Sequence, residues 1–222
     1  MNKNQTVLLT GGSGYIGSHL REYFEGIGMT VIAPSRSECD LSVAGATESF
    51  CTSLLTGGTS IDYIICNAAD QRIFPLHNID AGEIQKIMQI NFGSIAEIYA
   101  TLARHTSGVQ SILTISSIEA VRPRPGHLLY GASKAAVEAL TQSAAVELST
   151  IRTNSLRLGL ISRPGIEGSW PEGVSSWQRN TPLKRMGELT DVSEAAKFLL
   201  SASWITGQVL TLDGGNSVNP GW

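Results

Sequence analysis

The chain is 222 residues long, with 42% hydrophobic residues, 16% charged residues and a formal net charge of -3. This composition indicates a folded protein with a buried core and excludes a disordered one. The length favours a single domain over residues 1–222. The basic residues form no run, and no apolar stretch reaches the roughly 18 residues of a membrane span, so we expect neither a nucleic-acid nor a membrane partner.

The three cysteines, Cys39, Cys51 and Cys66, form no CxxC pair and are odd in number. Such a set makes no disulfide framework and fits a reducing compartment. The N-terminus "MNKNQTVLLTGG" passes from polar residues into a short apolar run, without the features of a signal peptide. We therefore expect a cytoplasmic protein, and we expect no metal site.

Short apolar, β-branched runs alternate with longer helical patterns along the chain. The predicted strands are 6–10, 29–33, 61–66, 111–116, 154–158 and 208–212. The predicted helices are 15–28, 44–55, 80–104, 131–149 and 191–202, the last with Thr190 or Asp191 as its N-cap. Strands that alternate with helices pair in parallel and are covered on both faces. We therefore predict an α/β fold, a Rossmann-type doubly wound parallel sheet of about six to seven strands in a three-layer α/β/α arrangement.

One irregular region covers about 162–187 and is rich in Gly, Pro, Trp and Ser. A loop of this length inside a compact domain is usually a lid or a binding loop. We expect a substrate loop or lid here, and the alternative is a solvent-exposed excursion without a role.

The stretch "TGGSGYIG", residues 10–17, follows the first predicted strand directly and opens the first helix. Glycines at such a corner allow a tight turn and let the backbone approach a pyrophosphate, while the helix N-terminus supplies free N–H groups. We therefore predict a dinucleotide site here; the alternative is a glycine-rich turn without a ligand. The residues expected to contact the dinucleotide are Thr10, Gly11, Ser13, Gly14, Tyr15, Ile16 and Gly17.

The end of the second predicted strand reads "VIAPSRSECDL" and carries no carboxylate at 33–35. An acid there would bind the ribose 2′-hydroxyl of NAD, whereas an arginine accommodates a 2′-phosphate. Because Ser35 and Arg36 stand at this place, we favour NADP(H) over NAD(H). The alternative is that Arg36 is a solvated loop residue.

Polar residues also follow the third and fourth predicted strands, in "CNAAD" and "ISSIEA", and the carboxyl ends of parallel strands meet in one crevice. Further along, "LLYGASKAAVEAL" places Tyr130 four residues ahead of Lys134, so the two share a helix face. Taken alone, this spacing carries little information.

With these surroundings the sequence resembles the short-chain dehydrogenase/reductase family, in its single-domain reductase branch, over nearly the whole chain. The tyrosine motif is Tyr130-Gly-Ala-Ser-Lys134, and the family's serine, 13 residues upstream, falls on Ser117. The resemblance implies four catalytic residues, which are Asn91, Ser117, Tyr130 and Lys134. It implies further cofactor contacts from Asp40, Leu41, Asn67, Ala68, Ala69, Gly159 and Ile161, together with Tyr130 and Lys134.

The resemblance also implies roles. Tyr130 would donate a proton to the substrate oxygen, with its pKa lowered by the Lys134 ammonium. Lys134 would bind the nicotinamide ribose, Ser117 would hold the substrate oxygen, and Asn91 would anchor a water on the way to Lys134. The alternatives are a strand-end cap for Ser117 and a helix-surface amide or cap for Asn91.

Ala69 stands where the family's Asn-Ala-Gly segment has its glycine, and the chain departs from the family pattern at three further places. Tyr15 stands where the reductase branch has its second glycine, so the motif reads TGxxGxxG, a spacing typical of the nucleotide-sugar-modifying branch. Leu158 replaces the usual proline before Gly159, and Arg163 replaces a threonine that contacts the cofactor.

The predicted function is an NADP(H)-dependent oxidoreductase that interconverts a carbonyl and a secondary alcohol, with 3-oxoacyl or other β-keto compounds among the candidate substrates. A nucleotide-sugar epimerase, reductase or dehydratase is one alternative, and a non-catalytic dinucleotide sensor or scaffold is another. Two tryptophans, Trp170 and Trp177, are candidates to cover an apolar substrate or to anchor a lid. Arg122, Arg124 and His127 are expected in the pocket wall, facing either an anionic substrate or water.

We also expect a homo-oligomer, a dimer or a tetramer. The helices around 80–104 and 131–149 have apolar faces that the related enzymes bury between subunits. The residues concerned are Ile95, Ile98, Ala135, Ala139 and Ala145, and the alternative is that they pack on their own sheet.

Overall fold

The computed structural model describes residues 3–105 and 107–219, and in this part of the chain the strands form one six-stranded sheet. The strand order is β2-β1-β3-β4-β5-β6, and every neighbouring pair is parallel. The strands are β1 (Thr6–Thr10), β2 (Thr30–Ile32), β3 (Tyr63–Cys66), β4 (Ser111–Ser117), β5 (Arg152–Leu158) and β6 (Val209–Leu212). The predicted doubly wound parallel sheet is confirmed.

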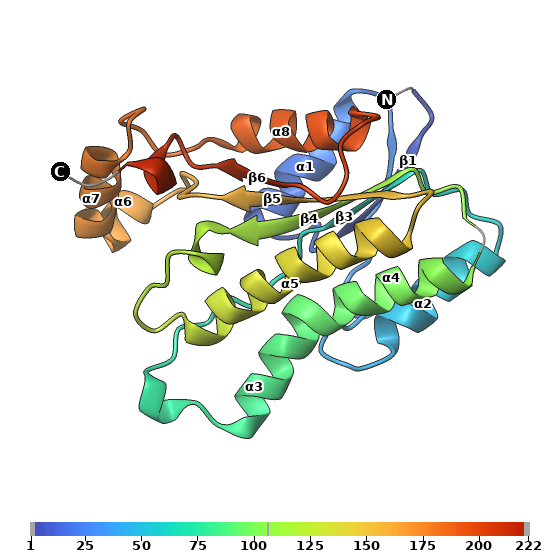
Figure 1. Cartoon of the computed structure of the whole chain (residues 1–222), viewed down its shortest axis with the longest axis horizontal. Coiled ribbons are helices and arrows are strands. Elements are labelled where there is room, and N and C mark those ends of the chain that lie inside the picture. The colour runs from blue at the N-terminus through green and yellow to red at the C-terminus, as the bar shows by residue number, and fades with distance from the viewer. Residues whose placement is uncertain (1–2, 106, 220–222) are drawn as a thin grey trace.

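Helices cover both faces of this sheet, which gives the predicted three layers (Figure 1). One face carries α1 (Tyr15–Gly26) and α8 (Leu189–Ser201), and the other carries α2 (Ala46–Thr56), α4 (Ser94–Arg104) and α5 (Leu128–Glu147). The predicted helix 80–104 consists of α3 (Ala81–Met88), a π-helical turn at Gln89–Gly93 and α4. Helix α5 begins three residues earlier than predicted, so it includes Tyr130.

The strands place successive side chains in two separate cores, one on each face of the sheet. In β1, Val7 and Leu9 lie in the core beneath α1 and α8, whereas Leu8 lies in the core beneath α2, α4 and α5. In β4, Leu113 and Ile112 divide in the same way. Burial of each such side chain contributes about 1.5–3 kcal/mol to folding, so strands that are apolar on both faces are stable only in this layered arrangement.

The region 162–187, predicted to be an irregular loop, contains two helices, and that prediction was wrong in this respect. They are α6 (Ile166–Ser169) and α7 (Pro171–Asn180), with Pro171 at the first position of α7, where a missing N–H has no cost. The segment has its own small core of Ile166, Val174 and Met186. Apolar residues spread through a Gly- and Pro-rich stretch thus order it by packing on one another.

Two further expectations need correction. The N-cap of α8 is Glu188, and Asp191 sits at the third helical position, where its carboxylate accepts a hydrogen bond from the Glu188 N–H over 2.8 Å. The Glu188 side chain accepts in turn from the Asp191 N–H, so two N–H donors at the helix end are satisfied. The helix therefore begins before the predicted N-cap residues Thr190 and Asp191. Ile95 and Ile98 are buried in the chain's own core, so they cannot form part of an interface between subunits.

Among the described residues, no helix combines the length and the apolar character that crossing a bilayer requires. Cys39, Cys51 and Cys66 are buried free thiols. In the same residues no group of three or more His, Cys, Asp or Glu side chains is arranged to hold a metal ion.

Candidate active site

The site lies at the carboxyl ends of β1 and β3, where the strand order of the sheet reverses. In open parallel sheets, the crevice outside such a reversal is where ligands bind. Asn67, just after β3, ties the two strand ends together, because its side-chain amide donates to the backbone oxygens of Thr10 and Gly11, each over 3.2 Å. The Thr10 hydroxyl accepts from the backbone N–H groups of Asn67 and Ala68 at 3.0 and 3.2 Å.

The glycine-rich turn between β1 and α1 has the close approach that the motif predicts. Gly11 has a φ of +69°, a backbone conformation that favours glycine. A Cβ on Gly17 would lie 2.0 Å from the Gly11 oxygen, so only a glycine fits in the first turn of α1. This packing leaves the backbone N–H groups at the start of α1 open to a pyrophosphate, and the residues present therefore fit a dinucleotide.

Seven of the predicted cofactor residues lie around one hollow of about 200 Å³ beside this turn. They are Thr10, Gly11, Ser13, Arg36, Asp40, Leu41 and Ala68, and the hollow is completed by Pro34, Cys39, Ser42 and Ile90. The hollow thus joins the glycine turn to the loop after β2, as expected for the adenosine end of a dinucleotide.

The loop after β2 carries positively and negatively charged side chains. The Arg36 side chain is 75% exposed, and its Nε lies 3.2 Å from an Asp40 oxygen. Asp40 also accepts hydrogen bonds from the Ser42 hydroxyl and N–H, which lower its carboxyl pKa to about 2. Glu38, which the sequence analysis did not consider, accepts hydrogen bonds from the Ser35 N–H and hydroxyl, both over 2.7 Å. An arginine and two carboxylates therefore stand together in the loop where Rossmann-type folds bind the ribose 2′ position.

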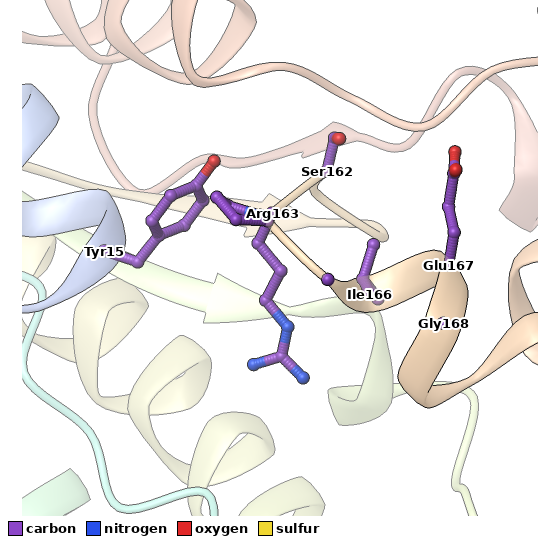
Figure 2. Close-up of a pocket in the computed structure, with 8 residues that line it drawn as sticks. Tyr15, Ser162, Arg163, Ile166, Glu167 and Gly168 are labelled. Atoms are coloured by element: carbon purple, nitrogen blue, oxygen red, sulfur yellow. The ribbon is translucent and has the colours of Figure 1, made fainter.

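A second hollow, of about 560 Å³, lies between the start of α1 and the segment that follows β5 (Figure 2). Tyr15 projects from the start of α1 toward this segment, and Arg163 extends beside it. The hollow is lined by Tyr15, Ser162, Arg163, Pro164, Gly165, Ile166, Glu167 and Gly168. Two of the four departures from the family pattern, Tyr15 and Arg163, thus meet at the same place.

Gly159 and Ile161 lie between this hollow and the sheet. A Cβ on Gly159 would fall 2.7 Å from the Trp177 ring and 2.9 Å from the Asp213 Cα, so the glycine lets Trp177 approach β5. Ile161 forms an isolated parallel bridge with Gly187. These contacts anchor both ends of the 162–187 segment to the sheet. The described contacts give Gly159 and Ile161 this structural role and do not test their predicted contact with the cofactor.

Tyr130 sits in the first turn of α5, and its side chain is 7% exposed. The Gln71 amide donates to its hydroxyl over 3.3 Å, and the Ser117 side chain is a second hydrogen-bonding neighbour. Burial is the largest effect and raises the phenol pKa to about 12, against the two hydrogen bonds, while the nearby Glu119 charge raises it further. The expected lowering of this pKa by Lys134 was wrong for this arrangement.

The reason lies in the direction of the Lys134 side chain. Its ammonium donates to the Ile115 backbone oxygen over 2.7 Å and lies 5.6 Å from the centre of the Tyr130 ring, facing the ring rather than the hydroxyl. Lys134 is 2% exposed, and burial lowers its pKa to about 8, with Cys66 and Glu138 acting in the opposite direction. The lysine is therefore a buried cation of reduced basicity.

Asn91 is fully buried in the π-helical turn between α3 and α4. Its side-chain oxygen accepts from the Asp70 N–H over 2.6 Å, and its amide donates to the Asp70 oxygen and the Ser133 hydroxyl at 3.0 and 2.9 Å. Ser133 donates in turn to the Tyr130 backbone oxygen over 2.7 Å. Asn91 therefore connects the strand end after β3 with the start of α5, and π-helical turns of this kind are frequent at functional sites.

The adjacent serines at the end of β4 point to different surroundings. Ser116 is buried and donates to Glu138 over 2.6 Å, where Glu138 also pairs with Arg157. Ser117 is half-buried, and its hydroxyl accepts from the Glu119 N–H over 3.2 Å. Ser117 rather than Ser116 is the serine beside Tyr130, as the spacing predicts.

Sequence reasoning missed Gln71 and Glu119, both close to the Tyr130 hydroxyl. Gln71 directly follows the "CNAAD" segment, and Glu119 lies two residues after Ser117, so their positions beside strand ends were a usable signal. Ala69 is half-buried in the same segment as Asn67 and Ala68. Figure 1 places the ends of β4 and β5, the start of α5 and the α6–α7 segment on one side of the molecule.

A parallel sheet with a glycine turn at its reversal, and a buried tyrosine and lysine one turn apart, defines a Rossmann-type protein with a candidate active site. A family model described as enoyl-(acyl carrier protein) reductase matches residues 6–217. The chain belongs to the short-chain dehydrogenase/reductase family and is an oxidoreductase of that family.

Individual relatives differ in the share of each protein that is matched. The chain is 32% identical over 165 residues to a glucose 1-dehydrogenase of Gluconobacter oxydans. This match covers 70% of this chain and 62% of that protein. It is 29% identical over 240 residues to a 3-oxoacyl-(acyl-carrier-protein) reductase of Chlamydia trachomatis, covering 96% and 97%. The ligand-free aldohexose dehydrogenase of Thermoplasma acidophilum superposes with a TM-score of 0.85 at 26% identity, over 97% of this chain and 95% of that one.

The lowered pKa of Lys134 predicts a pH-dependent stability. Between about pH 8 and the unperturbed 10.5, the unfolded chain holds a proton on this lysine that the folded chain has lost, so stability rises with pH. Below this window the folded protein carries a buried ammonium. We expect Lys134→Met to be more stable than the wild type at pH 7, by ~1–3 kcal/mol in urea unfolding, and to lose this advantage near pH 10.

Lys197→Met is the matched control, because Lys197 is an exposed lysine on α8. It should leave the free energy of unfolding within about 0.5 kcal/mol of the wild type at both pH values. A Lys134→Met protein that is less stable than the wild type at pH 7 would contradict the burial argument.

Proposed function

We propose that this protein is an NADP(H)-dependent oxidoreductase that interconverts a carbonyl and a secondary alcohol, with Tyr130 as the proton donor and acceptor. The observation that carries the proposal is the buried Tyr130 hydroxyl beside Ser117 and Gln71, at the same edge of the sheet as the glycine turn. A catalytically silent dinucleotide sensor would need no such buried phenol.

The glycine turn and the loop after β2 would hold the dinucleotide, with the turn's N–H groups toward the pyrophosphate and Arg36 toward the adenosine end. When bound, the nicotinamide supplies or accepts a hydride at the substrate carbon. The stretch 162–168, which includes the start of α6, lines the second hollow and would exclude water from that reaction.

Tyr130 has the protonation state that carbonyl reduction requires. With a pKa near 12 the phenol is neutral at physiological pH and can donate its proton to the substrate oxygen. Alcohol oxidation requires the phenolate, so the same residue favours oxidation only at alkaline pH. Ser117 and Gln71 would hold the substrate oxygen in line with the phenol.

Lys134 and Asn91 act around the tyrosine. The Lys134 ammonium lies over the face of the Tyr130 ring and would bind the nicotinamide ribose with its remaining donors. The Asn91 side chain contacts Asp70 and Ser133, so we propose that it positions the start of α5 and also anchors a water on the way to Lys134.

A carbonyl reductase is favoured over a nucleotide-sugar-modifying enzyme. The chain aligns with 97% of the length of the bacterial protein named as a 3-oxoacyl reductase, in spite of the TGxxGxxG spacing. β-Keto compounds of that kind are the first substrates to test.

Tyr130→Phe removes the proton donor and keeps the ring. We expect kcat for carbonyl reduction to fall at least 100-fold, because general acid catalysis contributes about 10²–10⁴-fold, while the Kd for NADPH stays within a factor of two. NADPH absorbance measures the first, and NADPH fluorescence on titration measures the second.

Tyr63→Phe is the control for the loss of a buried tyrosine hydroxyl. Tyr63 begins β3 at the opposite edge of the sheet, where its hydroxyl contacts Gln110. Its variant should keep the wild-type kcat, and a Tyr130→Phe enzyme of equal rate would reject the catalytic assignment.

Arg36→Ala tests the preference for NADP(H). We expect the Kd for NADPH to rise at least tenfold, about 1.4 kcal/mol, with little change for NADH, because only NADPH carries the 2′-phosphate. Arg21→Ala is matched, since Arg21 forms the same kind of exposed i,i+4 pair with Glu25 on α1. A carboxylate such as the nearby Glu38 binds the ribose 2′-hydroxyl of NADH. Equal losses of affinity for NADPH and NADH would therefore reject Arg36 as the phosphate contact.

We also propose that the protein is a homo-oligomer through α5. Ala135 and Ala139 are exposed on this helix, and Val146 is 81% exposed near its end. Small side chains allow two helices to pack closely. Light scattering should give a mass of at least two chains, and Ala135→Glu with Ala139→Glu should reduce it toward one; a monomeric wild type would refute the proposal.

A further inference from the structure

We propose that Glu119 and His127 form a hydroxyl-binding wall of the substrate pocket, and that the preferred substrates carry a further hydroxyl group near the reacting carbon, as sugars and polyols do. The inference rests on the proposed function and specifies the substrate class of the same site. It is carried by the placement of the two residues beside Tyr130 and by their incomplete hydrogen bonding.

Glu119 is placed by the chain turn that also carries Ser117. It lies in the short helical turn Ile118–Ala120 after β4, and its N–H donates to the Ser117 hydroxyl over 3.2 Å. Its backbone oxygen would lie 2.9 Å from a Cβ on Gly131, so the turn rests directly on the start of α5. The Glu119 side chain, 13% exposed, is close enough to Tyr130 for its charge to act on the phenol.

His127 caps the start of α5 and packs its ring edge against Tyr130, with 6.2 Å between the ring centres. Its Nδ1 lies 2.9 Å from a Glu119 oxygen, and the His127 side chain is 8% exposed. Although the two atoms are close, neither ring nitrogen nor that carboxylate oxygen completes a hydrogen bond of good geometry within the described residues. The Nδ1 and the Glu119 oxygen are therefore each other's neighbour, whereas the His127 Nε2 has no partner among the described residues. Because buried polar atoms in folded proteins nearly always have a partner, this Nε2 is suited to hydrogen-bond a polar group of a bound ligand.

The charges of this wall define what it would bind. Burial raises the Glu119 carboxyl pKa, and burial with the Arg124 charge lowers the His127 pKa, so both shifts oppose the formation of two full charges. The Arg124 guanidinium is 3.9 Å from the second Glu119 oxygen, too far for a hydrogen bond. The second Glu119 oxygen is therefore an acceptor with free capacity, and a substrate hydroxyl is the neutral donor that satisfies it.

The wall continues into the α6–α7 segment. The Arg124 guanidinium stacks on the Trp170 ring, 4.3 Å from its centre. The Gln71 amide also contacts the Tyr130 hydroxyl, over 3.3 Å. The phenol is thus flanked by polar groups, and an unhydroxylated alkyl chain placed there would leave buried polar atoms without partners, which costs more than the loss of one contact.

The test compares acetoin with butanone, which share a reacting carbonyl and differ in the adjacent hydroxyl group. For the wild type with NADPH, we expect kcat/KM for acetoin to exceed that for butanone at least tenfold, about 1.4 kcal/mol. Glu119→Leu should reduce this ratio at least tenfold, mainly through KM for acetoin. Glu119→Gln, which keeps the shape and one acceptor oxygen, should fall between the two.

Glu147→Gln is the control, because Glu147 is an exposed glutamate at the far end of the helix that carries Tyr130. It should leave the ratio unchanged. A thermal melt of each variant shows whether it folds, and Glu119→Gln keeps the test open where Glu119→Leu does not fold.

The outcomes separate the two proposals. A wild-type ratio near one overturns the hydroxyl-binding wall and leaves the reductase standing. So does a Glu119→Leu enzyme that loses activity on both ketones equally, since that is the result of a purely structural ion pair. If no carbonyl compound, β-keto esters included, is reduced and NADPH fluorescence does not change on mixing, the proposed function itself is rejected.

Discussion

The parallel pairing of β1 with β3 is the interaction on which the site depends. It matches Thr10 with Cys66, so both strands end at the same level, and Asn67 can then reach across to the Thr10 and Gly11 oxygens. Gly17 packs against Gly11 in the same corner. Because a register shift of one residue would turn Thr10 to the opposite face of the sheet, the geometry of the glycine turn depends on this ladder.

Burying polar groups in the candidate active site costs free energy, and hydrogen bonds reduce this cost. Lys134 is held by the Ile115 oxygen, and Asn91 by Asp70 and Ser133, so their polar atoms are not left without partners. Burying such groups without partners would cost several kcal/mol each. The cores on both faces of the sheet supply the stability that permits this, and the result is a preorganised electrostatic setting around Tyr130.

The side of the crevice that we assign to the substrate is less fully hydrogen-bonded than the side that we assign to the cofactor. Around the glycine turn the backbone is tightly packed. The wall formed by Glu119 and His127, in contrast, keeps polar atoms with unused hydrogen-bonding capacity. Arg124 stacks on Trp170 and thus connects this wall to the α6–α7 segment.

Local sequence patterns determined much of this protein. Alternating apolar strands and amphipathic helices predicted the layered parallel sheet, because burial on both faces requires continuous apolar strands. The glycine turn and the Ser117–Tyr130–Lys134 spacing were readable because short-range geometry fixes which side chains share a strand end or a helix face. The helices of 162–187 were missed, since their order comes from packing Ile166 and Val174 on Met186, which no local period records.

Only the tertiary structure decided the electrostatics of the site. The Tyr–Lys spacing on the helix is the same whether the ammonium faces the hydroxyl or the ring, and it is the Ile115 oxygen of β4 that holds the Lys134 ammonium. Burial then raises the Tyr130 pKa instead of lowering it, and the pairing of Glu119 with His127 brings together residues that sequence patterns treat separately. Desolvation and contact between distant segments depend on the whole fold, which is why the sequence alone could name Tyr130 and Lys134 but not their charges, and why it missed Glu119.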